Sequence, residues 1–228
     1  MQVAILIFGI LSVILMVFLP IPQLLTTLKT KNISNVSYPA FFIYYTGGAI
    51  FVAVMTMLKK TDPNIIINII GNTLFVGIMA LTLTLFMILD KKIKPIARIT
   101  IIFGLWIVFF SLLIWWISEY AAKSNGYFES SSTFLTILTI FANSCTALPF
   151  IAQIIKTLKN KSAEGISFVL LCCGLILNIS LGIYFAMLLK FGTAMWYVTL
   201  LFQTTGAIVY IIQILIYLSF KSKYKKIA

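Results

Sequence analysis

Apolar residues fill seven long stretches of the chain, and short polar breaks separate them. The stretches cover residues 3–28, 38–58, 64–90, 95–119, 131–158, 167–190 and 194–220. A helix rises about 1.5 Å per residue, so about 20 apolar residues are needed to cross the hydrocarbon core of a bilayer. The stretches meet this requirement, and the pattern predicts an all-α protein of seven transmembrane helices.

One segment of the chain occurs twice. Residues 19–38 align with residues 149–168 at an offset of 130, in the same part of the first and fifth predicted spans. The identical pairs are Ile21/Ile151, Gln23/Gln153, Thr27/Thr157, Leu28/Leu158, Lys29/Lys159, Lys31/Lys161 and Ser37/Ser167. Identities concentrated at equivalent points of two helix triplets indicate an internal duplication rather than a chance match.

The distribution of basic residues predicts the topology. Alternate breaks place thirteen of the 17 Lys and Arg residues on one side of the membrane and four on the other. The richer side is expected to be cytoplasmic, which puts the N-terminus outside and the C-terminus inside. Three spans per repeat would invert the second copy, and one added span restores its orientation. We therefore predict parallel repeats in a 3+1+3 arrangement: repeats at residues 1–92 and 123–220, a linker helix at 93–122 and a basic cytoplasmic tail at 221–228.

Composition supports a membrane protein and narrows the function classes. The chain is 61% hydrophobic and 10% charged, with a mean hydropathy of +1.10. Its net charge of +12 comes from short loops between apolar runs, so topology explains it and nucleic acid is not expected as a partner. The chain has no histidine, and its three cysteines fall inside apolar runs. We expect no metal, cofactor or disulfide, and we place the protein in a bacterial plasma membrane.

The duplicated segment carries proline and glutamine in a hydrophobic helix that leads into a basic loop. The first copy has Pro22 followed by Gln23, whereas the second has Ala152 before Gln153 and a proline one turn earlier, at Pro149. Proline removes a backbone donor, so the helix is expected to bend there and leave a carbonyl free. The neighbouring glutamine is a plausible donor to that carbonyl.

These residues, with the run KSAEGIS at 161–167, resemble the PQ-loop superfamily, which includes the SWEET sugar facilitators and the lysosomal cystine exporter. The resemblance implies a transporter that opens alternately to each side of the membrane. It also associates the prolines of these helices with gating. We therefore expect Pro22, Pro39 and Pro149, with the two PQ-loop glutamines, to form a hinge region near the cytoplasmic end.

Three amides are predicted near the middle of the membrane. Counting along the spans places Asn72 roughly 12 Å and Gln203 roughly 13 Å from the outer face of the membrane. Asn178 lies roughly 16 Å from the inner face. Asn72 and Gln203 are also repeat counterparts, at an offset of 131. An amide at this depth faces another helix or a cavity, so these side chains either bind a solute or hold the bundle together. SWEETs have Asn at both counterpart positions, so Gln203 departs from the sugar carriers.

Aromatic residues are candidates for the remaining walls of such a site. Tyr44, Tyr45, Tyr184 and Trp196 could supply ring faces to a solute. The alternative for each is packing against lipid or a neighbouring helix, and Trp196 also suits the aromatic belt at the membrane surface.

The five acidic residues all fall in loops or at span ends, so no carboxylate is expected at mid-depth for proton coupling. The leading hypothesis is a facilitator for a small neutral or zwitterionic metabolite such as a sugar, amino acid, nucleoside or vitamin. The alternative is a membrane receptor or adaptor like the KDEL retrieval receptor, although no Lys or Arg lies at mid-depth to bind a peptide carboxylate. An enzyme is not expected, because no nucleophile has a suitable partner. The expected partners are the solute and the bilayer, and the sequence does not decide whether the chain forms a homo-oligomer.

Overall fold

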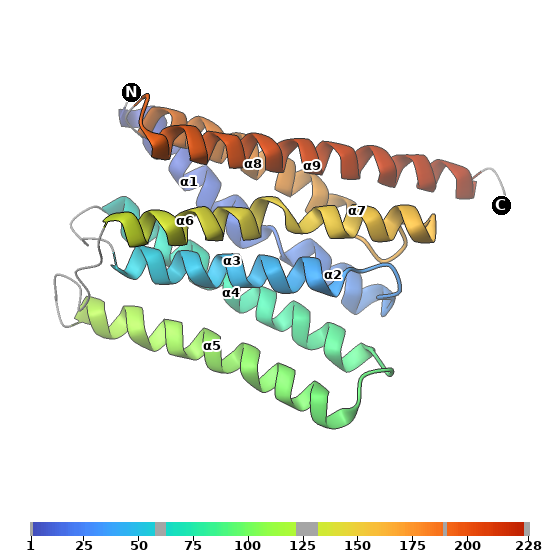
Figure 1. Ribbon diagram of the computed structural model, residues 1–228. Coiled ribbons are helices and arrows are strands. Elements are labelled where there is room, and N and C mark those ends of the chain that lie inside the picture. Colours follow the sequence, from blue (N-terminus) through green and yellow to red (C-terminus); the bar gives the residue numbers. More distant parts are fainter. Residues whose placement is uncertain (1, 58–62, 122–131, 189–190, 226–228) are drawn as a thin grey trace.

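The computed structural model describes residues 2–57, 63–121, 132–188 and 191–225 (Figure 1). Within these ranges the chain forms helices only. They are α1 (Gln2–Phe18), α2 (Ile21–Thr30), α3 (Tyr38–Met57), α4 (Pro63–Leu89), α5 (Pro95–Ala121), α6 (Ser132–Ala147), α7 (Pro149–Asn160), α8 (Phe168–Leu188) and α9 (Ala194–Lys225).

These helices make seven segments that are long and apolar enough to span a membrane, as the hydropathy pattern predicts. Five spans are single helices. The other two are broken: α1 and α2 form the span Val3–Thr30, and α6 and α7 form the span Thr133–Asn160. The breaks fall at Leu19–Pro20 and at Leu148, so the duplicated segment begins at the same structural feature in each copy.

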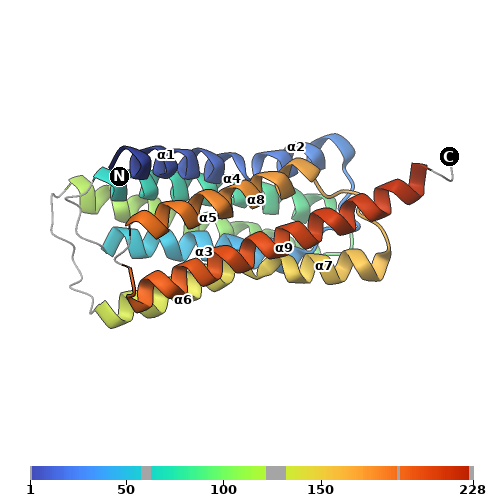
Figure 2. The same ribbon diagram turned by 90° about the horizontal axis from the view of Figure 1, so that it is seen from above.

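The two helix triplets have the same orientation. In Figure 1, α1 and α6 start at the same end of the bundle and run in the same direction. Figure 2 shows the pair formed by α1 and α2 on one side of the bundle and the pair formed by α6 and α7 on the other. The triplets interlock, because α1 packs against α8 and α3 packs against α6. Within the part of the chain that the structure describes, α5 packs against α3 and α4 alone.

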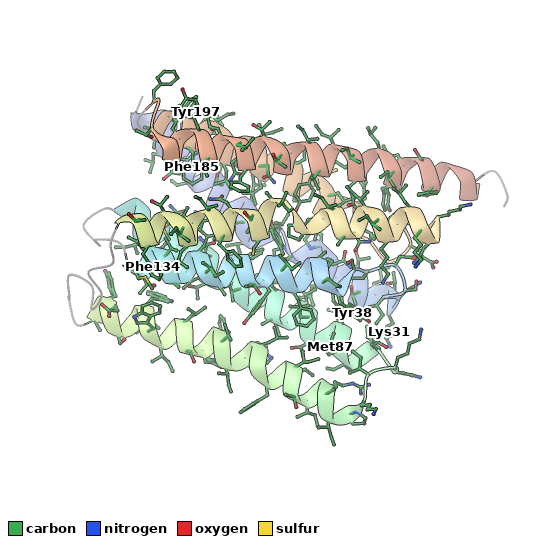
Figure 3. All side chains as sticks on the ribbon, viewed as in Figure 1. Lys31, Tyr38, Met87, Phe134, Phe185 and Tyr197 are labelled. Carbon is green, nitrogen blue, oxygen red and sulfur yellow. The ribbon has the colours of Figure 1, made fainter. Side chains whose placement is uncertain are left out.

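One end of the bundle carries two similar loops, at residues 31–37 and 161–167. We call it the basic end, because α2 and α7 each finish there with lysines. The helices stop at Lys31 (φ 52°) and Lys161 (φ 49°), which both adopt the left-handed conformation typical of a residue that ends a helix. Figure 3 shows Lys31 and Tyr38 at this end, and Phe134 and Tyr197 at the opposite end.

The outer surface of the bundle is apolar. Large hydrophobic side chains point outward from every span; Ile96 and Phe103 on α5, for example, are 81% and 66% exposed. Burial of these side chains in hydrocarbon is favourable, so the bilayer acts as their solvent. The last helix continues to Lys225, so residues 221–225 of the predicted tail extend α9 rather than form a separate segment.

Candidate functional site

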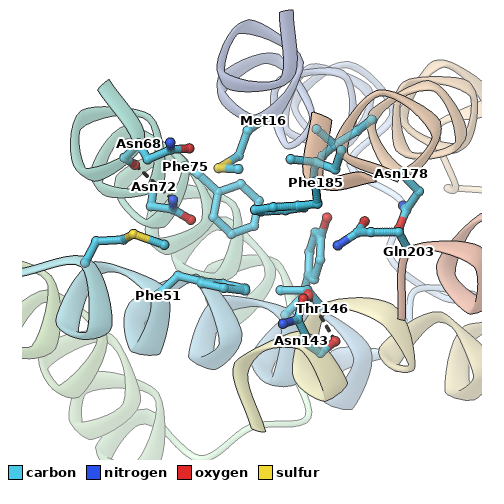
Figure 4. A pocket seen from close by; sticks show the side chains of 15 residues that line it. Met16, Phe51, Asn68, Asn72, Phe75, Asn143, Thr146, Asn178, Phe185 and Gln203 are labelled. Carbon is cyan, nitrogen blue, oxygen red and sulfur yellow. Dashed lines mark hydrogen bonds between the residues drawn. The ribbon is translucent and has the colours of Figure 1, made fainter. Parts of the chain in front are cut away.

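A cavity lies between the two helix triplets (Figure 4). Its walls come from α1, α3 and α4 of the first repeat and from α6, α8 and α9 of the second. The centres of water molecules can occupy about 60 Å³ of it. One water needs about 10–15 Å³ by this measure, so the cavity has room for several. Its polar lining residues are Asn68, Asn72, Asn143, Thr146, Asn178 and Gln203. Of the other nine lining residues, eight are aromatic, aliphatic or sulfur-containing and one is a glycine.

The cavity follows the internal duplication. Several lining residues are repeat counterparts, at an offset of 130 in the first two spans of each repeat and 131 in the third. These pairs are Met16/Thr146, Gly48/Asn178, Phe51/Leu181, Met55/Phe185 and Asn72/Gln203. The site is therefore built between the repeats by equivalent positions of each.

The structure brings the three predicted midplane amides to this cavity. Asn72 is 4% exposed, and Asn178 and Gln203 are each 8% exposed. Asn72 Nδ2 donates to the Asn68 carbonyl at 2.9 Å, and Asn178 Nδ2 donates to the Gly174 carbonyl at 2.8 Å. Each asparagine thus uses a donor on its own helix and keeps its side-chain oxygen as an acceptor. The Gln203 amide has no hydrogen-bond partner among the described residues, so it offers both a donor and an acceptor to the cavity.

The sequence analysis missed three polar lining residues. Asn68 lies one turn before Asn72 on the same face of α4, a spacing that could have identified it. Asn143 is 3% exposed, and its Nδ2 donates to the Thr139 carbonyl at 2.9 Å. It lies near the middle of its span, so counting depth could have found it as well. Thr146 gave no comparable signal.

Three of the predicted aromatic residues lie outside the cavity. The Tyr45 hydroxyl donates to the Leu105 carbonyl on α5 at 2.7 Å, whereas Tyr44, one residue earlier on the helix, lines the cavity. Tyr184 is buried facing α1, where a Cβ at Gly9 would lie 3.0 Å from its ring. Trp196 Nε1 donates to the Ala186 carbonyl at 3.3 Å near the start of α9. Successive helical residues differ by about 100°, so depth alone could not assign these side chains to the cavity.

The two PQ-loop glutamines each bind the loop of the other repeat. Gln23 Nε2 donates to the Gly165 carbonyl at 2.9 Å, and its oxygen accepts the Ser167 backbone N–H at 3.0 Å. In the second copy, Gln153 Nε2 donates to the Asn35 carbonyl at 2.7 Å, and its oxygen accepts the Ser37 N–H at 2.7 Å.

Both glutamine side chains are buried, and each also donates to a threonine one turn later on its own helix, Thr27 or Thr157. The expectation that these amides satisfy a carbonyl freed by proline in their own helix is therefore wrong. Their partners are the loops of the opposite repeat, which only the tertiary structure brings within reach.

The prolines have different positions in the two copies. The first break falls at Leu19–Pro20, just before Pro22, which lies in the first turn of α2. The second falls at Leu148, directly before Pro149, which begins α7. Pro39 lies in the first turn of α3, where its missing N–H removes no helical hydrogen bond. The second copy thus bends at Pro149, although it has alanine at the position equivalent to Pro22.

Packed aromatic rings separate the cavity from the basic end. Tyr44 lines the cavity, and its ring lies 5.6 Å from that of Phe150, which in turn lies 4.8 Å from Tyr210. Phe41, one turn closer to the basic end, lies 5.1 Å from Phe86 and 6.1 Å from Phe150. All five side chains are buried. The cavity is therefore closed at the basic end, and it extends from the middle of the bundle toward the opposite end.

A polar cluster lies at the basic end itself. The Tyr38 hydroxyl donates to Asp90 Oδ2 at 2.7 Å, and this hydrogen bond holds the pKa of Asp90 below its usual value. The Lys156 ammonium donates to the Val36 carbonyl and lies 5.7 Å from the centre of the Tyr38 ring. These contacts join the ends of α3, α4 and α7 next to the two similar loops.

The acidic residues of the described part of the chain do not line the cavity. Glu119 is nevertheless buried, at 2% exposure, two residues before α5 ends. Its position at a span end agrees with the sequence analysis, but its burial was not expected.

Comparisons with known proteins agree with this architecture. The profile of the PQ loop repeat family matches residues 4–64 and again residues 134–191, together more than half of the chain. The solved structure of a eukaryotic SWEET transporter has a similar fold, with a TM-score of 0.62 at 13% sequence identity, over 96% of this chain and 98% of that one. No curated protein sequence matches the chain. The duplicated segments, the seven spans and the profile matches together show that this chain belongs to the PQ loop repeat family and has a transporter-like membrane scaffold.

Proposed function

We propose that this protein is a membrane carrier that moves a small polar solute across the bilayer by alternating access. The observation that supports this most directly is the cavity between the repeats, which is closed at the basic end and into which Asn72 and Gln203 project from counterpart positions. Buried amides that lack a complete set of partners cost free energy, and a bound polar solute would supply those partners.

The basic end faces the cytoplasm in this proposal, because it collects most of the Lys and Arg residues. The structure then corresponds to a state closed toward the cytoplasm. Opening that side requires α2 to separate from α8 and α7 to separate from α3, and the helix breaks at Leu19–Pro20 and Leu148 provide two places at which α2 and α7 can turn.

The carrier works as a facilitator, without coupling to protons. Proton-coupled carriers usually keep a carboxylate in the membrane to bind and release the proton. The described residues that line the cavity include no Asp or Glu, and Glu119 lies on α5, which contributes nothing to the walls.

Solute flux into proteoliposomes tests the proposal, with sugars, amino acids, nucleosides and vitamins as the panel. Asn72→Ala and Gln203→Ala should each lower flux of the transported solute about tenfold or more, since each removes a partner of a buried polar group. Gln213→Ala is the matched control, because Gln213 is a buried amide on the same helix outside the cavity, and its Oε1 has no partner among the described residues. Undiminished flux in both cavity variants, or no flux of any solute by the wild-type protein, would contradict the proposal.

A further inference from the structure

At one contact between helices beside the cavity, the two repeats place the glycine and the larger side chain on opposite helices. In the first repeat Gly48 on α3 faces Phe75 on α4, and a Cβ at Gly48 would lie 2.6 Å from the Phe75 ring. Their counterparts are Asn178 on α8 and Gly206 on α9, so the small residue is now on the other helix. A Cβ at Gly206 would lie 2.2 Å from Asn178 Oδ1. Each pair thus combines one glycine with one large side chain that fills the space left by it.

This exchange makes the cavity chemically asymmetric although the scaffold is duplicated. It replaces an aromatic ring of the first repeat with an amide in the second. With Asn178 included, the second repeat contributes four Asn, Gln or Thr residues to the lining and the first contributes two. In Figure 4, Asn178 and Gln203 lie on one side of the cavity, Asn68 and Asn72 on the opposite side, and Phe75 between them.

The cavity is poorly suited to a charged or zwitterionic solute. Among the described residues that line it, none is Lys, Arg, Asp or Glu. An ammonium or carboxylate group bound there would leave water without an opposite charge, which is far more costly than burying a neutral hydrogen-bonding group.

The apolar lining indicates a solute with substantial carbon surface. Nine of the 15 lining residues are aromatic residues, methionine, leucine or glycine. They include Phe51, Phe75 and Phe185. Small-molecule sites typically have apolar and aromatic walls with a few well-placed polar groups, and aromatic walls can pack against another aromatic ring. A heterocyclic base presents an apolar face to such rings and a polar edge to the amides, whereas a hexose carries hydroxyl groups around its whole ring.

We propose that, given the carrier function above, the cavity selects an uncharged heterocycle such as a nucleoside. Its hydrogen-bonding edge lies against Asn178 and Gln203, and its ring face lies against Phe75. Asn178 determines specificity, and Gly206 is a positioning residue, because any larger side chain there would displace the Asn178 amide from the cavity wall.

The test uses the full chain, purified and reconstituted, with uridine, glucose and leucine as probes. Uridine should raise the unfolding temperature of the wild-type protein. It should also enter proteoliposomes that contain the protein at least tenfold faster than glucose or leucine. Asn178→Ala should lower uridine affinity about tenfold, as expected for one lost hydrogen bond to a buried group. Gly206→Ala should lower uridine affinity by a similar factor, although Asn178 itself is not substituted in this variant.

A double variant, Asn178→Gly with Gly206→Phe, copies the pair that the first repeat already accommodates. It should fold, since the packing is transplanted, but it should lose uridine binding. Uridine binding retained by this variant and by Asn178→Ala overturns the inference, as does preferential binding of glucose or leucine.

Failure of the inference is distinguishable from failure of the carrier proposal. Flux of leucine or glucose without flux of uridine would leave the carrier intact and overturn the solute class. An absence of flux for every solute in the panel would overturn both.

Discussion

Gln23 of the first repeat accepts a hydrogen bond from the backbone N–H of Ser167 in the second, at 3.0 Å. Gln153 does the same with Ser37, the counterpart of Ser167, at 2.7 Å. Each repeat therefore holds the start of the other repeat's second span. A carrier that opens at the basic end has to break these paired contacts, so they oppose opening on that side.

Replacement of Gln23 by alanine should destabilise this end of the protein. The buried Gly165 carbonyl and Ser167 N–H both lose a partner, so the free energy of unfolding should fall by about 1–3 kcal/mol. Thermal unfolding in detergent measures the loss, and hydrogen exchange at Ser167 should become faster. Thr30→Ala is the control on the same helix, because Thr30 is exposed and its hydroxyl bonds only within the first repeat, to the Thr26 carbonyl and the Asn32 N–H. Unchanged exchange at Ser167 would contradict the cross-repeat role.

Acidification should weaken the polar cluster at the basic end. The hydrogen bond from Tyr38 lowers the pKa of Asp90 below 3.8, so its stabilising contribution is fully present above pH 3.8 and is lost as the pH falls through the folded-state pKa. Unfolding temperatures of wild-type protein and Tyr38→Phe, measured between neutral pH and pH 3, should therefore converge as the pH falls. A difference that stays constant over this range would show that the hydroxyl does not act through the Asp90 charge.

Tyr44 and Tyr45 should respond differently to substitution, because one lines the cavity and the other bonds to α5. Tyr45→Phe removes a bond to the Leu105 carbonyl and should cost about 1 kcal/mol of stability, with solute binding unchanged. Tyr44 lines the cavity, so replacing it with alanine should lower solute affinity. Unfolding and binding measured on both variants separate the two roles. A loss of affinity in Tyr45→Phe equal to that in Tyr44→Ala would contradict the assignment.

The sequence predicted the fold because hydropathy and duplication are properties of the chain alone. Spans of about 20 apolar residues and the copy at residues 149–168 were sufficient to predict seven spans, arranged as two parallel triplets joined by one linker helix. Depth counting also located Asn72, Asn178 and Gln203, since an amide far inside a span has to face protein or a cavity.

The details of the site depend on information that depth does not contain. Whether Tyr44 or Tyr45 faces the cavity is decided by the rotation of α3 against α5 and α6, and a change of one residue turns the side chain by about 100°. The loop residues that Gln23 binds in the other repeat lie more than 140 residues away and become neighbours only when the triplets interlock. The glycine lies on opposite helices in the pairs Gly48/Phe75 and Asn178/Gly206. This difference is visible only once the two residues of each pair are known to be in contact.

Solute flux should not depend on a pH gradient across the membrane. The carboxylates of the described residues lie away from the cavity walls, and the buried one, Glu119, lies near the end of α5. Proteoliposomes with an imposed gradient and proteoliposomes treated with a protonophore should therefore show the same initial rate at the same solute gradient. Glu119→Gln, which keeps the shape but removes the titrating group, should also transport at the wild-type rate. A rate that falls when the gradient collapses, and that becomes insensitive to the gradient in Glu119→Gln, would instead assign proton coupling to this carboxylate.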